Sequence, residues 1–292
     1  MTDRTDGEKN RTNKGTLYLV GTPIGNLADI SERAVKVLSE ADFIAAEDTR
    51  NSLRLLTHFG IQKPLISYFE HNKTERGAEI VERLRDGETC ALVTDAGMPA
   101  ISDPGEDLVR LCTDNSIPVT TVPGPCAAIT ALTLSGLPTA RFTFEGFLSA
   151  SKSERRSALA ELSGERRTMI FHEAPHKLRA TLSDMAAAFG EDRRIALCRE
   201  LTKLNEEILR MTLGEAVSYY GENDPRGEFV LVVEGAKNAK ASACFWEDMS
   251  IREHVAHYVG SGMSKNDAIK AAAKDRGLPK NSVYQEVLDL KV

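Results

Sequence analysis

The chain has 292 residues, of which 41% are hydrophobic and 27% are charged, and its formal net charge is −6. This length is more than most single hydrophobic cores need, and the composition excludes a disordered or fibrous protein. The negative net charge also excludes a surface that attracts nucleic acid everywhere, so any such contact requires a local basic patch.

The five cysteines form no C-x-x-C pair, and their odd number is typical of a reducing compartment rather than of a disulfide framework. No apolar run approaches the ~20 residues that span a bilayer. Residues 1–14 are polar and lack the apolar segment of a signal peptide. We therefore expect a cytoplasmic protein with no membrane contact and a disordered tail over residues 1–14.

Residues 15–123 alternate short apolar runs with segments of helical periodicity. The segments between the runs predict helices, and Asp29 or Ser31 is placed to cap the first of them. Such alternation predicts an N-terminal α/β domain whose mostly parallel sheet is covered by helices on its faces. The predicted strands are residues 16–20, 43–46, 65–68, 90–93 and 118–122.

A second α/β domain is expected over residues 124–238. The small and polar residues at 237–242 are typical of a linker at its end. Helices are predicted at 127–134, 177–189 and 213–220, and strands at 142–148, 169–171, 195–198, 206–211 and 228–235.

Residues 239–292 have a different pattern, in which three short helices are separated by glycine-containing turns, as in a helix-turn-helix. Ser264-x-x-Asp267 resembles a capping box, and Asn281 or Ser282 can cap the third helix. From Gly262 onward six basic residues outnumber four acidic ones, so this helical domain can contact a polyanion or dock a protein. The basic residues are Lys265, Lys270, Lys274, Arg276, Lys280 and Lys291.

Two loops after predicted strands carry glycines and prolines that specify the backbone path. They run from Val93 to Gly105 and from Gly21 to Leu27. The second loop begins G-x-x-x-G with a proline inside, which is not the fingerprint of dinucleotide-binding folds, and no P-loop motif occurs. Small residues at the carboxyl ends of parallel strands let a ligand approach the main chain. We therefore expect these loops to hold an adenosine-type cofactor.

Charged side chains follow several predicted strands. Asp48 or Thr49 could simply cap the next helix, with Arg50 solvated. Because strand ends on one edge of a sheet converge in space, these groups are also candidates for a catalytic or substrate-binding cleft. The acids concerned are Glu47, Asp48, Glu70, Asp95, Glu173 and Glu200.

The segment His172-Glu173-Ala174-Pro175-His176 matches the zinc motif H-E-x-x-H in its letters. Zinc binding requires both histidines one turn apart on a continuous helix, whereas proline suits the first helical position and not the interior. We therefore predict a strand end followed by a helix start, with no metal. His254 and His257 are expected to be solvated surface histidines.

Residues 149–167 are polar and carry five basic side chains among three acidic ones. Such a segment is either an ordinary solvated helix face or a contact for RNA. The basic residues are Lys152, Arg155, Arg156, Arg166 and Arg167.

Six ordered segments closely resemble the ribosomal RNA small-subunit methyltransferase I family of the tetrapyrrole methylase superfamily. The resemblance covers about residues 15–235, and the tail is similar to the C-terminal helical domain of that family. The segments are Gly21–Leu27, Ala46–Arg50, Thr94–Gly105, Pro123–Ala128, Glu173–His176 and Arg199–Lys203.

This resemblance implies an α/β, two-domain tetrapyrrole methylase-like fold (class III), with S-adenosyl-L-methionine (SAM) in the cleft between the domains. It also implies a homodimer that methylates a cytidine ribose 2′-hydroxyl in the decoding region of 16S rRNA within the small ribosomal subunit. Positions that match cofactor contacts in relatives are Thr22, Pro23, Asp95, Gly97, Met98, Pro99, Ala100, Ile101, Ser102, Cys126, Ala127 and Phe171.

The chain departs from the family pattern in a few places. Ser149 stands where the family commonly has proline, and Phe171-His172 replaces the usual Phe-Tyr. Lys177 stands where arginine is common. Gly97-Met98-Pro99 replaces the Gly-Asp-Pro of relatives that modify tetrapyrroles, which favours the RNA-modifying branch.

The expected reaction is an in-line methyl transfer to the ribose oxygen, in which positioning supplies much of the rate. The hydroxyl needs a proton acceptor, and the candidates are Glu47 and Asp48 with Arg50, or Glu173 with His176. Arg50 could equally hold a phosphate. Two other classes stay open: a small-molecule methyltransferase for a corrin-type ring, and a non-catalytic ribosome-assembly factor that binds RNA.

Overall fold

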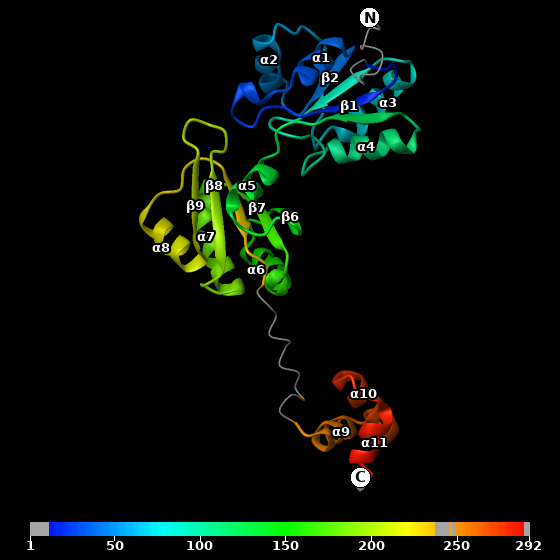
Figure 1. Cartoon of the computed structure of the whole chain (residues 1–292). Coiled ribbons are helices and arrows are strands. Elements are labelled where there is room, and N and C mark those ends of the chain that lie inside the picture. Colours follow the sequence, from blue (N-terminus) through cyan, green and yellow to red (C-terminus); the bar gives the residue numbers. More distant parts are fainter. Residues whose placement is uncertain (1–11, 237–245, 247–248, 289–292) are drawn as a thin grey trace, which may run out of the picture. The chain divides into compact units, whose positions relative to one another are not determined.

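The computed structural model of the chain describes residues 12–236, 246 and 249–288 (Figure 1). The chain divides into two compact units, Met1–Ala236 and Lys237–Val292. Most of the tail expected over residues 1–14 and the linker expected over 237–242 lie outside the described residues, as do Cys244 and Lys291.

The first unit begins with a five-stranded sheet in which every pairing is parallel, which confirms the prediction for this half of the chain. The strand order is β3-β2-β4-β1-β5, so the chain leaves a gap between β1 and β2 that β4 later fills. The loops after β1 and β4 are therefore neighbours, as at the topological switch point where open α/β sheets bind ligands. The strands are β1 Leu17–Val20, β2 Phe43–Ala46, β3 Leu65–Ser67, β4 Cys90–Val93 and β5 Val119–Val122.

Helices cover both faces of this sheet. Successive strand residues point to opposite sides, and both sets are apolar and are buried under helices. Tyr18 and Val20 pack with one pair of helices, α1 and α2, whereas Leu17 packs with the other pair, α3 and α4. Ser31 caps α1 and Asp48 caps α2, each through its side chain. The helices are α1 Glu32–Glu40, α2 Thr49–His58, α3 Lys73–Arg85 and α4 Gly105–Asp114, with the 3₁₀ turn η2 at Leu27–Asp29.

A second five-stranded sheet follows in the order β6-β7-β10-β8-β9. Only the β6–β7 pairing is parallel, and β10 runs antiparallel between β7 and β8. The carboxyl ends of β7 and β8 consequently meet the start of β10 at one edge. The strands are β6 Phe142–Phe147, β7 Thr168–Glu173, β8 Arg194–Arg199, β9 Glu207–Thr212 and β10 Phe229–Val233.

Helix α5 covers one face of the second sheet through Ala128, Ala131 and Leu132. The opposite face packs against α6, α7 and α8, which bury Leu159, Leu182 and other apolar side chains. The helices are α5 Ala127–Ser135, α6 Lys152–Glu161, α7 Pro175–Phe189 and α8 Leu213–Glu222, with the 3₁₀ turn η3 at Leu162–Gly164.

The second unit contains α9 Ile251–Gly260, α10 Lys265–Arg276 and α11 Lys280–Glu286. The expected Ser264 cap is present, and Gly277 ends α10 in the left-handed conformation. Helix α11 begins earlier than predicted, because Pro279 and not Asn281 or Ser282 occupies its N-cap. No helix in the described parts of the chain is both long and apolar enough to cross a membrane.

The expectation that His254 is a solvated surface residue is wrong. Its side chain is 0% exposed, and its ring stacks on Trp246 with 5.4 Å between ring centroids. Arg276 Nε donates to His254 Nδ1 at 3.1 Å, and Asp275 Oδ2 lies 3.3 Å from Nε2. His254 is therefore a structural histidine of α9, held against Trp246 and the end of α10.

Candidate active site

The loops after β1, β4 and β5 are joined at the carboxyl edge of the first sheet. Thr22 and Gly97 exchange backbone hydrogen bonds of 2.9 and 3.1 Å, although neither belongs to a strand. A Cβ on Gly21 would lie 2.7 Å from Gly124 Cα and 2.8 Å from Met98 Sδ, so the three loops touch through their main chains. Gly124 N also donates to Met98 Sδ at 3.2 Å. Met98 thus fastens the loops together.

The loop from Gly97 to Gly105 has a backbone that its own carboxylate maintains. Gly97, Ala100 and Ser102 have positive φ values of 87°, 68° and 63°. The side chain of Asp103 accepts from the backbone N–H groups of Ala100 (3.0 Å), Ile101 (3.3 Å) and Gly105 (2.8 Å). These bonds offset the cost of the left-handed residues, since such strain persists only where the surroundings impose it.

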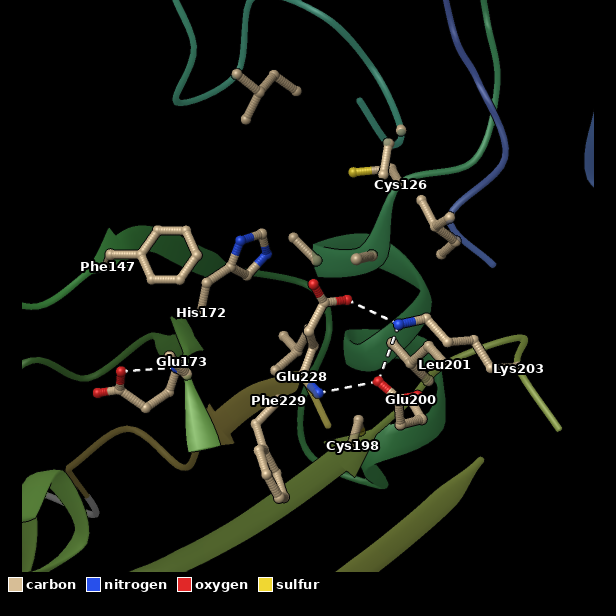
Figure 2. A pocket seen from close by; sticks show the side chains of 18 of the residues that line it. Cys126, Phe147, His172, Glu173, Cys198, Glu200, Leu201, Lys203, Glu228 and Phe229 are labelled. Carbon is tan, nitrogen blue, oxygen red and sulfur yellow. Dashed lines mark hydrogen bonds and ion pairs between the residues drawn. The ribbon is translucent and has the colours of Figure 1, made fainter. Parts of the chain in front are cut away.

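A cavity of about 430 Å³ lies between these loops and the edge of the second sheet (Figure 2). Its volume falls in the usual range of ligand sites. The loops after β1 and β4 contribute Ile24, Ala96, Gly97, Met98 and Ile101. The second half contributes Cys126, Ala127, Ala128, Phe144, Phe147, His172, Glu173, Ala174, Pro175, Cys198, Glu200, Leu201, Lys203, Glu228, Phe229 and Val230. We call this space the first cavity.

One wall of the first cavity is a charged network at the end of β8 and the start of β10 (Figure 2). Lys203 Nζ lies 2.9 Å from both Glu200 Oε1 and Glu228 Oε2, and Glu228 N donates to Glu200 Oε1 at 3.0 Å. Glu200 has a positive φ of 51°, which turns the chain sharply after β8. A Cβ on Gly25 would lie 2.4 Å from Lys203 Cγ, so the loop after β1 rests directly on this network.

His172 stands opposite, between Phe144 and Phe147, whose rings meet its own edge to face at 5.2 and 5.3 Å. Burial lowers the pKa of His172, and this effect outweighs the negative charge of Glu228, which raises it. A neutral imidazole is therefore favoured near pH 7. Its Nε2 is buried and has no hydrogen-bond partner in the described parts of the chain. Sequence reasoning did not single out His172 as a site residue, although its place at a strand end was a usable signal.

A second cavity of about 380 Å³ lies at the ends of β1 and β4 beside α2. Its lining is Thr22, Pro23, Gly25, Leu27, Asn51, Ser52, Arg54, Leu55, His58, Thr94 and Asp95. The loop after β4 belongs to both spaces: Thr94 and Asp95 line the second cavity, whereas Ala96, Gly97 and Met98 line the first. We call this space the second cavity.

The residues expected to bind the cofactor divide between these spaces. Gly97, Met98, Ile101, Cys126 and Ala127 line the first cavity. The second cavity takes Thr22, Pro23 and Asp95. Pro99, Ala100 and Ser102 line neither and form the supporting turn, and Phe171 is 0% exposed within the core of the second sheet.

The expected cluster of Glu47, Asp48 and Arg50 forms at the ends of β2 and β4. Asp48 accepts from Arg50 N (2.8 Å), Nε (3.1 Å) and a terminal guanidinium nitrogen (2.7 Å), and these bonds lower its pKa to about 2. Asp48 N donates to Asp95 Oδ1 at 3.2 Å, and Thr94 Oγ1 donates to Glu47 Oε2 at 2.9 Å. None of the three lines the first or the second cavity, but Thr94 and Asp95, which line the second, are hydrogen-bonded to Glu47 and Asp48.

Glu173 and His176 lie at the junction of β7 and α7 but do not face one another as a pair. The Glu173 side chain is 1% exposed; it accepts from Thr181 Oγ1 (2.5 Å) and Ala174 N (2.9 Å) and pairs with Lys177 Nζ at 3.1 Å. His176 is exposed in the first turn of α7. Pro175 occupies the start of α7, which confirms the predicted strand end and helix start. No group of three or more potential ligands in the described residues is arranged to hold a metal ion.

The basic segment over residues 149–167 combines exposed basic side chains with one that is buried. Arg155 is buried and donates through Nε and a terminal nitrogen to Asp184 Oδ2 at 2.9 and 2.7 Å. Arg156 donates to Asp184 Oδ1 at 2.7 Å, and Arg167 pairs with Glu165. Three of the five basic side chains are therefore engaged in ion pairs within the protein.

Comparison with known proteins agrees with this architecture. The profile of the tetrapyrrole (corrin/porphyrin) methylases matches residues 16–217. This chain superposes on the structure of a cobalt precorrin-4 methyltransferase with a TM-score of 0.57 at 16% identity, covering 75% of this chain and 95% of that one. For a diphthine synthase structure the TM-score is 0.58 at 14% identity, with 75% and 89% covered. The chain belongs to the tetrapyrrole methylase family.

Similarity to curated proteins identifies the branch of this family to which the chain belongs. Ribosomal RNA small subunit methyltransferase I of Halalkalibacterium halodurans is 50% identical over 275 residues, 94% of this chain and 95% of the relative. Its counterparts in Bacillus subtilis and Escherichia coli O157:H7 are 47% and 43% identical, each over 94% of this chain and over 94% and 96% of the relative. Within the tetrapyrrole methylases, the chain is thus a member of the ribosomal RNA small subunit methyltransferase I family.

Proposed function

We propose that this protein uses SAM to methylate the 2′-hydroxyl of a cytidine in the decoding region of 16S rRNA. The observation that supports this proposal best is how much of the chain is similar to ribosomal RNA small subunit methyltransferase I. The 275 residues aligned with the H. halodurans methyltransferase exceed the 236 residues of the first unit, so the similarity continues into the helical unit. An enzyme acting on a small ring would have no need of that helix-turn-helix-like unit.

The first cavity fits SAM on two counts. Apolar and small side chains provide most of its wall, and the main chain packs closely at Gly97, where a Cβ would lie 3.3 Å from Pro125 O. His172 Nε2 is a buried polar atom with no hydrogen-bond partner in the described residues, so a bound ligand can supply one. When bound, SAM supplies an electrophilic methyl group on its sulfonium. We assign its binding to Gly97, Met98 and Ile101 on one side and to Cys126, Ala127 and His172 on the other.

We assign a positioning role to Thr22, Pro23 and Asp95, which line the second cavity next to the residues of the first. Thr22 is bonded to Gly97, and Asp95 precedes the stretch that lines the first cavity. They are placed to hold the reacting ends of cofactor and acceptor close together, which is where positioning has its largest effect on rate. Pro99, Ala100 and Ser102 shape the loop from behind, and Phe171 supports the wall below His172.

A ribose hydroxyl is a weak nucleophile until a neighbouring group accepts its proton. We assign this role to the cluster of Glu47, Asp48 and Arg50. Asp48, whose pKa Arg50 lowers to about 2, stays ionised but is a weak base, so we assign it to fixing Arg50. Glu47 is exposed and is the proposed proton acceptor. Glu173, whose carboxylate is enclosed by three partners, we assign to positioning, with His176 as the alternative proton acceptor.

The proposed partner is the small ribosomal subunit, bound by a homodimer in the cytoplasm. The helical unit offers Lys274 and Lys280, which are exposed at the end of α10 and the start of α11. Tyr284 is 46% exposed one turn further along α11. Cationic and aromatic side chains together are typical of RNA contacts.

The test is incubation with labelled SAM and small subunits that lack the modification, followed by mapping of the methyl group. Label on one cytidine ribose supports the proposal, and label on no RNA refutes it. Glu47→Gln is expected to lose at least about 100-fold in turnover, because general-base catalysis typically contributes 10²–10⁴-fold. Glu75→Gln is the matched control, because Glu75 is exposed in the first turn of α3 and lines neither cavity. Wild-type turnover by Glu47→Gln would remove it as the proton acceptor.

A further inference from the structure

Helix α2 carries a row of basic side chains that the cofactor site does not use. Arg50, Arg54 and His58 follow one another at intervals of four residues, which places them on one face of the helix. Arg50 is bound to Asp48, whereas Arg54 is exposed and has no hydrogen bond or ion pair with any residue in the described parts of the chain. Arg54 and His58 line the second cavity.

The opposite end of this cavity is acidic. Asp95 accepts from Asp48 N at 3.2 Å through Oδ1 and from Asn51 Nδ2 at 3.3 Å through Oδ2. Asn51 precedes Arg54 by three residues, about one helical turn. The cavity therefore presents hydrogen-bond acceptors at the N-terminal end of α2 and cationic donors one to two turns further on.

We propose that Arg54 and His58 bind a backbone phosphate of the RNA strand, so that the ribose next to it reaches the Asp95 end of the second cavity. This inference rests on the proposed function and names the part of the protein that holds the acceptor nucleotide. A guanidinium matches two phosphate oxygens at once, and an imidazole N–H adds a further donor. The volume of about 380 Å³ lies within the range of small-molecule sites.

The position of this site relative to the cofactor residues strengthens the assignment. Residues 94–98 contribute to both cavities, because Thr94 and Asp95 line the second and Ala96, Gly97 and Met98 line the first. A phosphate held in the second cavity would lie beside the loop that also lines the first, so that the neighbouring ribose has only to reach the rim of this loop to meet the methyl donor.

The experiment compares Arg54→Gln, and Arg54→Gln combined with His58→Gln, with Arg110→Gln in full-length protein. Arg110 is 65% exposed on α4, lines neither cavity and undergoes the same loss of charge. The affinity of each variant for unmethylated small ribosomal subunits is measured at several salt concentrations. SAM affinity is measured separately, and the melting temperature verifies that each variant is folded.

We expect Arg54→Gln to bind subunits about ten-fold more weakly than Arg110→Gln, since a hydrogen bond to a charged group typically contributes a factor of this size. The slope of log affinity against log salt should flatten by about 0.7 for each single-strand phosphate that the variant no longer neutralises. SAM affinity should stay as in the wild type, because SAM is assigned to the first cavity.

Equal subunit affinity and equal salt slopes for Arg54→Gln and Arg110→Gln would overturn the inference while leaving the methylation proposal intact. A selective loss of SAM affinity in Arg54→Gln would also overturn it, by making the second cavity part of the cofactor site. If the wild type binds subunits but transfers no methyl group, the methylation proposal fails, and the weaker binding of Arg54→Gln still supports the phosphate site. If the wild type binds no subunits, both proposals fail.

Discussion

The ion pair between Arg155 and Asp184 gives a sharp test of how the fold supports the first cavity. One terminal nitrogen of Arg155 also donates to the carbonyl oxygens of Ser149 and Ala150 at 3.3 and 3.4 Å. Arg155 thereby ties α7 to the loop that follows Phe147, a residue that lines the first cavity. Arg155→Met removes the donors while keeping an apolar side chain of similar length.

The cost can be worked from the burial of the two partners. Their side chains are 7% and 4% exposed, and removing one member of a buried pair typically costs about 3–5 kcal/mol. Asp184 keeps one hydrogen bond of 2.7 Å from Arg156, so we expect the lower end, about 3 kcal/mol. The Arg156 side chain is 57% exposed, so Arg156→Met should cost at most about 1 kcal/mol.

Urea unfolding of the two variants and the wild type measures both costs, provided that the slopes agree. We also expect weaker SAM binding in Arg155→Met than in Arg156→Met, because only the former releases the loop after Phe147. Equal losses of stability in the two variants would refute the reasoning, since they would mean that burial does not decide the strength of this contact.

Three further predictions concern the cavity walls and the helical unit. The folded state holds His172 with a lowered pKa, so wild-type stability should fall as pH drops through about 6.5, and His172→Phe should show a smaller fall between pH 8 and pH 5 in thermal unfolding. Gly21→Ala forces a Cβ to 2.7 Å from Gly124 Cα and should cost about 1–3 kcal/mol, whereas Gly221→Ala, with open space around it, should cost nothing; equal effects would contradict this. Arg276→Met removes the bonds that tie α10 to the segment before α9 and should lower the melting temperature of the helical unit, so an unchanged transition in calorimetry would disprove that role.

Local signals in the sequence determined most of the first sheet and several helix boundaries. A continuous apolar run such as Leu17–Val20 identifies a strand that is buried on both faces. Ser31, Asp48 and Pro175 mark helix starts through chemistry that acts within a few residues. These predictions held because both the signal and its partner lie in one stretch of chain.

The ordered motifs also determined the family, while the tertiary structure decided how the site residues are distributed. The sequence grouped Thr22, Asp95, Gly97 and Cys126 as one set, yet the fold divides them between two cavities. The division depends on the Thr22–Gly97 bridge, whose partners lie 75 residues apart.

Burial of charged and polar side chains was likewise settled only by the fold. Arg155 looked like part of a basic surface until Asp184, 29 residues away, was placed against it. His254 looked solvated, but Arg276 and Trp246 enclose it. Sequence periodicity reports which face of an element is apolar, whereas the partner of a polar group is chosen by long-range packing, because an unpaired charge cannot remain in a dry interior.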